Sequence, residues 1–274
     1  MMKQKISELL KETREKNPLV HHITNAVTIN DCANATLAAG GSPVMADAIE
    51  EVEEMTSISS ALVINFGTIK KDSLVAMEKA MRKANEKDIP VVFDPVGVGA
   101  TTYRTKSVQW LLEQVKVTVI RGNVSEVASL IGVEAKTSGV DAGEVGEDKT
   151  TIAKKTAKKY NTVVVISGEI DVITDGERVV YVENGHQMLT RVSGTGCMTA
   201  SIIGCFVGAS RSVLEGALAG ISYMGLAGER AVKRLKEGEG VGTFKINLFD
   251  ELSTLTNTVW EKEVKMYEAK QPIL

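Results

Sequence analysis

Aromatic side chains are scarce in this chain of 274 residues, where they make up only 4%. Because nucleic-acid bases stack on aromatic rings, this scarcity leaves little surface for such contacts. The formal net charge is −3 and no block of lysine and arginine stands out, so the electrostatic footprint of a nucleic-acid-binding protein is also missing. The sequence therefore predicts that nucleic acid is not a partner.

Cysteine is also rare, and its pattern excludes a disulfide framework. The three cysteines, Cys32, Cys197 and Cys205, form no C-x-x-C pair and are odd in number, which favours a reducing compartment. The stretch 1–16 is amphipathic and charged throughout, so it lacks the apolar region of a secretory signal. No run reaches the roughly 18 apolar residues of a membrane span. These absences predict a cytoplasmic protein without a membrane partner.

Motifs of several large enzyme classes are missing. The sequence contains no G-x-x-x-x-G-K-[ST], no H-E-x-x-H and no G-x-S-x-G, which leaves the P-loop, zinc-hydrolase and α/β-hydrolase interpretations without support. The stretch "GTGCMT" at 194–199 lacks the third glycine of a dinucleotide fingerprint. It also follows a predicted hairpin late in the chain, whereas that fingerprint opens the first βαβ unit.

The first 167 residues alternate between two kinds of segment. Short apolar runs rich in β-branched residues are typical of buried strands, and longer segments between them have the period of an amphipathic helix. Strands are expected at 19–23, 61–65, 89–94, 117–120 and 162–167. Helices are expected at 26–39, 70–86, 123–132 and 149–160, with Asn25 and Asn123 as caps for two of them. This alternation predicts βαβ crossovers and a mostly parallel sheet.

After residue 168 the pattern changes. The turn dipeptides Asp175-Gly176 and Asn184-Gly185 separate alternating runs, which predicts an antiparallel hairpin at the sheet edge. Helices are expected afterwards at 195–208, 212–235 and 247–266. No linker or repeat interrupts the chain, so we expect one α/β domain over residues 1–274, with helices flanking the sheet.

Polar residues gather where the predicted strands end. In open α/β sheets, ligands bind at the carboxyl ends of the strands. Those ends carry Asp94, Arg121, Asn123, Glu126 and Ser167. Arginine binds phosphate oxygens, and magnesium takes one or two carboxylates and shares phosphate oxygens. The set therefore indicates a site for a phosphate-rich ligand with a divalent cation.

A glycine turn at 194–197 precedes the apolar helix expected at 195–208. Gly194 and Gly196 would let successive backbone N–H groups approach an anion, and the helix dipole would add to the attraction. This turn is therefore a candidate for holding phosphoryl oxygens during a transfer reaction.

Two of these motifs resemble those of the ribokinase-like kinases. In these kinases an N-x-x-E motif, here Asn123 to Glu126, organises magnesium and phosphate. A G-[AT]-G-D motif forms an anion hole and supplies the catalytic base. This chain has Gly194-Thr195-Gly196 followed by Cys197 in place of the aspartate.

The cysteine and three longer stretches resemble the hydroxyethylthiazole kinase family of thiamine salvage. The stretches are "HHITNAVTINDCANATLAAGGSPVMADA" at 21–48, "DPVGVGAT" at 94–101 and "RGNVSE" at 121–126. The resemblance implies a ribokinase-like fold. It also implies that ATP, with Mg²⁺, phosphorylates the alcohol of 4-methyl-5-(2-hydroxyethyl)thiazole.

The resemblance also implies roles for individual residues. Arg121, Ser167 and Asn123 would contact ATP, and Met45 and Gly194 the thiazole alcohol. Cys197 would stand where relatives have their base, Gly194 and Gly196 would form the anion hole, and Asp94 and Glu126 would serve magnesium. The family is trimeric, with each site shared between neighbouring subunits, which would account for substrate residues in 21–48.

Two other functions on the same fold stay open. One is a nucleotide-dependent hydrate dehydratase, a lyase; such enzymes generally keep an aspartate at the position of Cys197, which disfavours this alternative. The other is a non-catalytic nucleotide-binding regulator. The presence of Asp94, Arg121, Asn123 and Glu126 together disfavours a regulator, because a silent copy is free to lose them.

Overall fold

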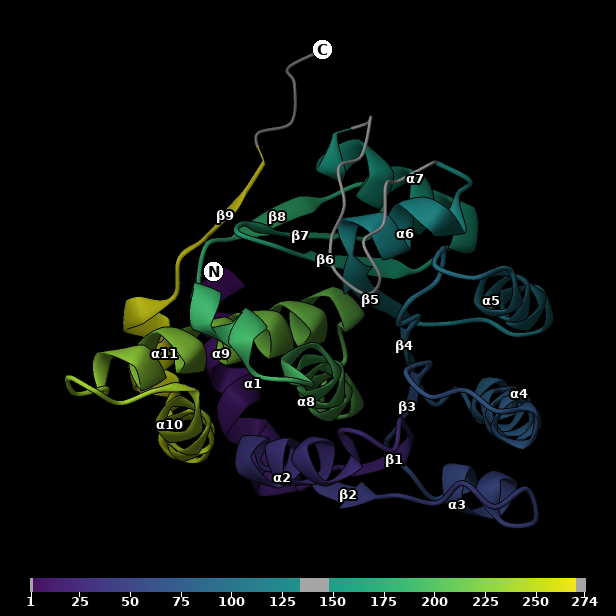
Figure 1. Ribbon diagram of the computed structural model, residues 1–274, viewed down its shortest axis with the longest axis horizontal. Coiled ribbons are helices and arrows are strands. Elements are labelled where there is room, and N and C mark those ends of the chain that lie inside the picture. The colour runs from purple at the N-terminus through teal and green to yellow at the C-terminus, as the bar shows by residue number, and fades with distance from the viewer. Residues whose placement is uncertain (1, 134–147, 270–274) are drawn as a thin grey trace.

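The computed structural model describes residues 2–133 and 148–269 and is built around a nine-stranded sheet (Figure 1). The strands lie in the order β2-β1-β3-β4-β5-β6-β7-β8-β9. Their bounds are β1 Leu19–Ile23, β2 Ser42–Val44, β3 Ala61–Asn65, β4 Val91–Asp94, β5 Val119–Asn123, β6 Val163–Ser167, β7 Asp171–Thr174, β8 Val179–Val182 and β9 Met266–Glu268.

The sheet is parallel from β2 to β6 and antiparallel from β6 to β9. The predicted α/β class and mostly parallel sheet are therefore confirmed, and so is the hairpin, formed by β7 and β8. The hairpin belongs to the antiparallel edge region of the sheet, as predicted. The sequence did not predict β9, which pairs outside the hairpin with Glu268 opposite Val180.

Helices cover both faces of the sheet. In Figure 1, α3, α4 and α5 lie on one side of the strands and α8 and α9 on the other. The bounds are α1 Met2–Lys16, α2 Ile29–Ala39, α3 Val52–Ser57, α4 Lys71–Glu86, α5 Thr102–Gln114, α6 Val124–Leu130, α7 Lys149–Tyr160, α8 Thr195–Ala209, α9 Val213–Lys233, α10 Val241–Thr254 and α11 Asn257–Glu263.

The sheet separates two hydrophobic cores. Successive side chains of a strand point to opposite faces. On β3, Val63 therefore packs with the core of α1, α2, α8, α9 and α10, while Leu62 and Ile64 pack with the core of α4 to α7. Burial on both faces explains why these strands read as continuous apolar runs in the sequence.

Two local predictions are wrong. Asn25 does not cap α2: the helix begins at Ile29, and Asn25 Oδ1 accepts hydrogen bonds from the amides of Val27 and Thr28 instead. The single helix expected at 247–266 is divided into α10, α11 and the edge strand β9. Thr256 starts a new helix there because its hydroxyl accepts a hydrogen bond from the amide of Val259 at 3.3 Å.

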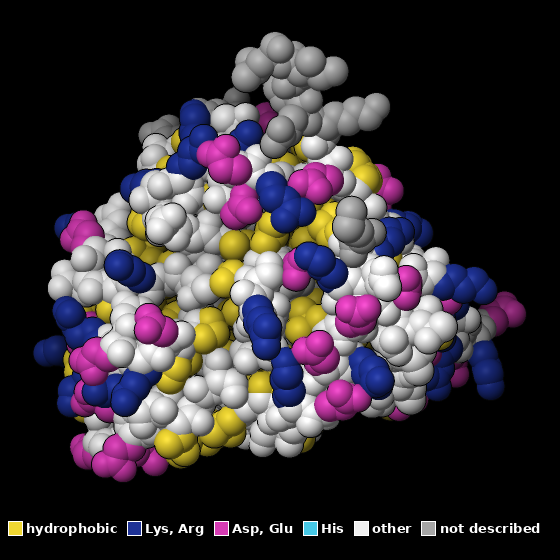
Figure 2. Space-filling view, turned by 180° about the vertical axis from the view of Figure 1, so that it is seen from behind, with side chains coloured by type: hydrophobic (Ala, Val, Ile, Leu, Met, Phe, Trp, Pro, Cys, Tyr) yellow, Lys and Arg dark blue, Asp and Glu magenta, His cyan; other side chains and the backbone are white. Residues whose placement is uncertain are grey.

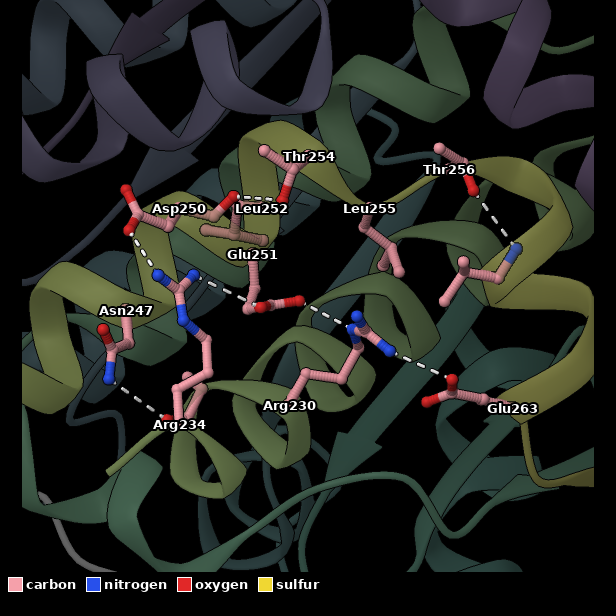
Figure 3. A network of polar contacts seen from close by, with 12 residues as sticks. Arg230, Arg234, Asn247, Asp250, Glu251, Leu252, Thr254, Leu255, Thr256 and Glu263 are labelled. Atoms are coloured by element: carbon pink, nitrogen blue, oxygen red, sulfur yellow. Dashed lines mark hydrogen bonds and ion pairs between the residues drawn. The ribbon is translucent and has the colours of Figure 1, made fainter. Parts of the chain in front are cut away.

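A polar network ties the three carboxyl-terminal helices together (Figure 3). Glu251 of α10 is buried and accepts hydrogen bonds from Arg230 at 2.6 Å and Arg234 at 3.3 Å, both on or next to α9. Arg230 also reaches Glu263 of α11 at 3.0 Å. The helices created by the break at Thr256 are therefore held to α9 by paired charges.

The surface carries charges of both signs. Figure 2 shows the face opposite to that of Figure 1, where lysine and arginine side chains alternate with aspartate and glutamate. Among the helices of the described residues, none combines the length and the apolar character that crossing a membrane requires.

Candidate active site

Side chains from three neighbouring strands and one helix meet at the carboxyl edge of the sheet. Arg121 of β5 donates from Nη2 to Ser167 Oγ of β6 at 2.9 Å. Gly196, in the first turn of α8, packs directly against the same guanidinium: a Cβ atom built there would stand 2.6 Å from Arg121 Nη1. The structure thus brings Arg121, Ser167 and Gly196 together, as the sequence predicted.

The glycine turn that opens α8 depends on the backbone freedom of glycine. Gly194 has a φ of 86°, in the left-handed region, and a Cβ there would lie 2.4 Å from Thr28 Cγ2. Its carbonyl accepts the hydrogen bond from the amide of Met198 at 2.8 Å, so the helix starts at once. The first backbone N–H groups of α8 have no acceptor within the helix and are available to an anion.

Asp94 is fully buried at the end of β4 and has one oxygen without a partner. Its Oδ2 accepts from Asn65 Nδ2 at 2.8 Å, whereas Oδ1 has no hydrogen bond and lies 3.9 Å from Arg121 Nη1. Arg121 Nε is likewise buried without a partner. Burial raises the pKa of Asp94 to about 7; Arg121 opposes the rise and Glu126 adds to it. Two buried polar atoms without hydrogen bonds, one on each of these paired residues, fit a site made for a ligand.

Glu126 uses both carboxyl oxygens on backbone amides. Oε2 accepts from the N–H of Asn123 at 2.8 Å and Oε1 from that of Gly97 at 2.9 Å. Asn123 Oδ1 in turn accepts from the N–H of Glu126 at 2.9 Å, which makes a capping box at the start of α6. Burial raises the pKa of Glu126 although these amides favour its charge. The residue joins the loops that follow β4 and β5; its role in holding magnesium stays a prediction.

Cys197 lies half-buried in the first turn of α8. Asn25 Nδ2 donates to its Sγ at 3.3 Å. Burial, and after it the negative charge of Asp94, raise the pKa of the Cys197 thiol to about 11. At neutral pH position 197 therefore holds a neutral thiol.

Met45 does not join this group within one chain. It follows β2, and β1 and β3 separate β2 from β4. The register sets Val44, the last residue of β2, level with Val91, the first residue of β4. At about 4.8 Å between neighbouring strands these two positions lie about 14 Å apart, and Asp94 stands three residues further along β4. A contact between Met45 and the substrate at Cys197 stays a prediction that depends on a neighbouring subunit.

A cavity of about 840 Å³ opens beside Arg121. Arg121, Asn123, Ser167 and Gly196 line one end of it, and Met224 of α9 gives it an apolar wall. Its volume lies within the range of sites for nucleotide-sized ligands.

Asp171 also lines this cavity, although it was not identified from the sequence as a site residue. It is buried at the start of β7, and its Oδ1 accepts from the N–H of Gly168 at 2.9 Å. Burial raises the pKa of Asp171 to about 7, although Lys149 and Arg121 pull the other way. Its position, four residues after the last residue of β6, was the signal that could have found it.

The fold of this chain is that of the ribokinase-like class. A ribokinase-like superfamily protein from Enterococcus faecalis V583 superposes with a TM-score of 0.63 over 92% of this chain and 95% of its own, at 11% identity, a likeness of fold alone. Within this class, the chain belongs to the hydroxyethylthiazole kinase family, which matches residues 10–258. It is therefore a kinase, and the resemblance seen in the sequence is confirmed.

Two relatives support this assignment along the whole chain. A hydroxyethylthiazole kinase of Clostridium beijerinckii is 50% identical over 270 residues, which cover 96% of this chain and 97% of the relative. The solved structure of a hydroxyethylthiazole kinase protein from Pyrococcus horikoshii OT3 has a TM-score of 0.88 and 39% identity, with 97% of this chain and all of the other covered.

Proposed function

We propose that this chain transfers the terminal phosphoryl group of ATP to the hydroxyl group of 4-methyl-5-(2-hydroxyethyl)thiazole, a step of thiamine salvage. One observation carries the proposal: Arg121, Ser167 and Gly196 meet at the end of a nucleotide-sized cavity, immediately beside Cys197. A triphosphate in that cavity would lie against the guanidinium and point its terminal phosphate at the turn that opens α8.

The phosphates would be held by two sets of groups at this end of the cavity. Arg121 and the hydroxyl of Ser167 would bind phosphate oxygens, while the amides that follow Gly194 would take the transferred group. Asn123 lines the cavity, and its Oδ1 is occupied by the amide of Glu126, so it would shape the phosphate end rather than bind through that oxygen.

The carboxylates fit a magnesium ion, although unequally. Asp94 Oδ1 is buried, makes no hydrogen bond and faces Arg121 at 3.9 Å, so it is free to serve as a cation ligand. Glu126 would serve less directly, because both of its oxygens already accept amide hydrogens. Among the described residues no three acidic, histidine or cysteine side chains cluster, which suits magnesium bound by one or two carboxylates and phosphate. Bound there, the ion would neutralise charge on the phosphates.

Cys197 would act by position rather than as a strong base. Its thiol is neutral at pH 7 because its pKa is raised, and only a thiolate could take the proton of the alcohol. Phosphoryl transfer has a loose transition state in which orientation and charge neutralisation dominate. Cys197 would therefore orient the attacking hydroxyl next to the amides of the turn.

A trimer with sites between subunits completes the proposal. Large apolar side chains are exposed on and beside α2 and on α10, which pack together: Val27 is 70%, Leu37 57% and Ile246 65% exposed. Exposed large apolar side chains on neighbouring helices are typical of a subunit interface. In the assembled trimer, Met45 of one subunit would reach the thiazole bound beside Cys197 of the next. The three free cysteines agree with a reducing cytoplasm.

The test is an assay of the purified chain with Mg²⁺, ATP and the thiazole alcohol. We expect ADP release that depends on the alcohol, and a phosphorylated thiazole in the mass spectrum. ADP released only with a hydrated nicotinamide cofactor would indicate the lyase, and nucleotide binding without turnover the regulator. Either result would overturn the proposal.

A further inference from the structure

Two side-chain amides, those of Asn65 and Asn25, connect the carboxyl group of Asp94 with the thiol of Cys197. Asn65, the last residue of β3, donates from Nδ2 to Asp94 Oδ2 at 2.8 Å. Its Oδ1 accepts from Asn25 Nδ2 at 2.9 Å and from the amide of Gly67 at 2.9 Å. Asn25 Nδ2 also donates to Cys197 Sγ at 3.3 Å. Four side chains thus form one path from Asp94 to Cys197.

The orientation of both amides is determined by their neighbours. Asn25 Oδ1 accepts from the amides of Val27 and Thr28, each at 3.1 Å, so its nitrogen must face Asn65 and the thiol. Asn65 must direct its nitrogen at the carboxyl of Asp94, because the amide of Gly67 occupies its oxygen. Turning either amide over would set donor against donor or oxygen against oxygen. The network has therefore one arrangement only.

Burying the polar side chains of this path costs free energy, and they lie at the candidate active site rather than in either hydrophobic core. Asn25 is 4%, Asn65 2% and Asp94 0% exposed. Buried polar groups cost free energy unless every one is paired, and a fully paired network makes a single geometry rigid. Asn65 is the residue of the path that hydrogen-bonds to the carboxyl of Asp94 and, on its other side, to Asn25.

We propose that Asn65 is a positioning residue of the kinase reaction. By binding Asp94 Oδ2 it leaves Oδ1 as the oxygen that faces Arg121. By accepting from Asn25 Nδ2 it shares, with the two backbone amides bound to Asn25 Oδ1, in holding the group that donates to the thiol of Cys197. Asn65 touches neither substrate. It fixes the distance between the carboxylate at the phosphate end and the side chain beside the attacking hydroxyl, and reaction rates fall steeply when such distances change. The proposal rests on the site assigned under Proposed function.

Two variants of Asn65 distinguish its effect on Cys197 from its effect on Asp94. Asn65→Leu removes every hydrogen bond of the amide. Asn65→Asp keeps the acceptor for Asn25 and Gly67 but turns an oxygen toward Asp94 Oδ2. Asn85→Leu is the matched control: Asn85 also hydrogen-bonds in both directions, to the amide and the carbonyl of Lys116 at 2.8 and 2.9 Å, but at the opposite ends of the strands.

The first measurement needs no substrate. Iodoacetamide is added to the nucleotide-free protein and alkylation is located by mass spectrometry; Cys32 and Cys205 are fully buried, so Cys197 is the cysteine that reacts. The N–H of Asn25 favours the thiolate. We expect Asn65→Leu to slow alkylation of Cys197 by roughly threefold or more, because a smaller fraction of the thiol is ionised. The alkylation rates of Asn65→Asp, which keeps the acceptor for Asn25, and of the control Asn85→Leu are measured at the same pH for comparison.

The second measurement is steady-state kinetics. We expect Asn65→Leu and Asn65→Asp to lower kcat by about tenfold or more while the KM for ATP stays within about twofold, since Arg121 and Ser167 are untouched. Asn85→Leu should keep both constants. Unchanged or faster alkylation in Asn65→Leu, or a kcat equal to that of the control, would overturn the proposal. A wild-type enzyme inactive on the thiazole would refute the proposed function instead, while the alkylation rates would still report on Asn65.

Discussion

At the scale of single residues, position 197 raises the sharpest question. Relatives with an aspartate there have a carboxylate that can accept the alcohol proton, whereas burial and Asp94 raise the pKa of the Cys197 thiol to about 11. General-base catalysis is worth about 10²–10⁴-fold, so a neutral thiol contributes less than that. The hydrogen bond from Asn25 and the turn at Gly194 hold the side chain of Cys197 in the site, where it would orient the attacking hydroxyl group.

We therefore predict that Cys197→Asp remains a working kinase. Cys197→Ser should lose activity yet keep a measurable rate, because a hydroxyl can still orient the substrate. Steady-state kinetics on both variants test this, with thermal unfolding and ATP binding measured alongside. An inert Cys197→Asp enzyme that folds and binds ATP normally would show that the thiol does something an oxygen base cannot.

Gly196 gives a second prediction, since it has no room for a side chain. A Cβ atom would stand 2.6 Å from Arg121 Nη1 and would push the guanidinium away from Ser167. We expect Gly196→Ala to raise the KM for ATP and to lower kcat by about tenfold or more. Gly242→Ala is the control, because nothing lies within 4 Å of a Cβ atom at that position. Equal kinetics in the two variants would contradict the packing argument.

Asp171 predicts a pH dependence of stability. Burial raises its pKa to about 7 in the folded chain, against about 3.9 in an unfolded one. Because the folded state holds this proton more tightly, the stability that the group contributes is full below about pH 4 and is lost as the pH rises toward 7. Asp171→Asn removes that loss, so its melting temperature should gain on the wild type between pH 5 and pH 8.

The gain at pH 8 should amount to at most about 4 kcal/mol, the equivalent of a shift of about three pKa units. Asp72→Asn, at an exposed position in the first turn of α4, is the control, and its difference in melting temperature from the wild type should stay the same between pH 5 and pH 8. Parallel melting curves for Asp171→Asn and the wild type across this range would mean that Asp171 titrates normally.

At the scale of elements, the network around Glu251 decides how the carboxyl-terminal helices pack. Glu251 is buried and pairs with Arg230 and Arg234, whereas Asp250 makes its pair with Arg234 at the surface. We expect Glu251→Gln to lower the free energy of unfolding by about 1–3 kcal/mol, since hydrogen bonds to charged groups are lost. Asp250→Asn should cost about 1 kcal/mol or less. Urea unfolding of both variants makes the comparison, and equal losses would refute it.

At the scale of the whole molecule, the exposed apolar side chains of Val27, Leu37 and Ile246 predict assembly. Sedimentation should show three copies of the 29.4 kDa chain. Leu37→Asp and Ile246→Asp should give inactive monomers, because charges would be buried at the interface. Tyr103→Asp, which alters an equally exposed apolar residue on α5, should leave the trimer intact. An active monomer would refute both the interface and the shared site.

Short-range features of this protein were determined by the sequence alone. Five strands could be predicted because their β-branched runs are buried on both faces, and the turn at Gly194 and the capping box of Asn123 and Glu126 involve residues within four positions of one another. The strands β2 and β9 have only three residues each and no run of β-branched residues that would predict them. They are extended because they pair with the longer strands β1 and β8. The break at Thr256 was missed because one hydroxyl decides it.

Only the tertiary structure decided which distant residues meet. The order of the parallel strands places Asn65 between Asn25 and Asp94, and it keeps three strand spacings, about 14 Å, between β4 and β2, which Met45 follows. The antiparallel turn from β6 into β7 brings Asp171 into the cavity beside Arg121. No local pattern records the contacts of Asn65 with Asn25 and Asp94, because these residues lie 29 or more positions away and are joined to it through helical crossovers. Local hydrogen bonds and side-chain periodicity are properties of neighbouring residues, whereas the geometry of this site arises from the packing of both cores against the sheet.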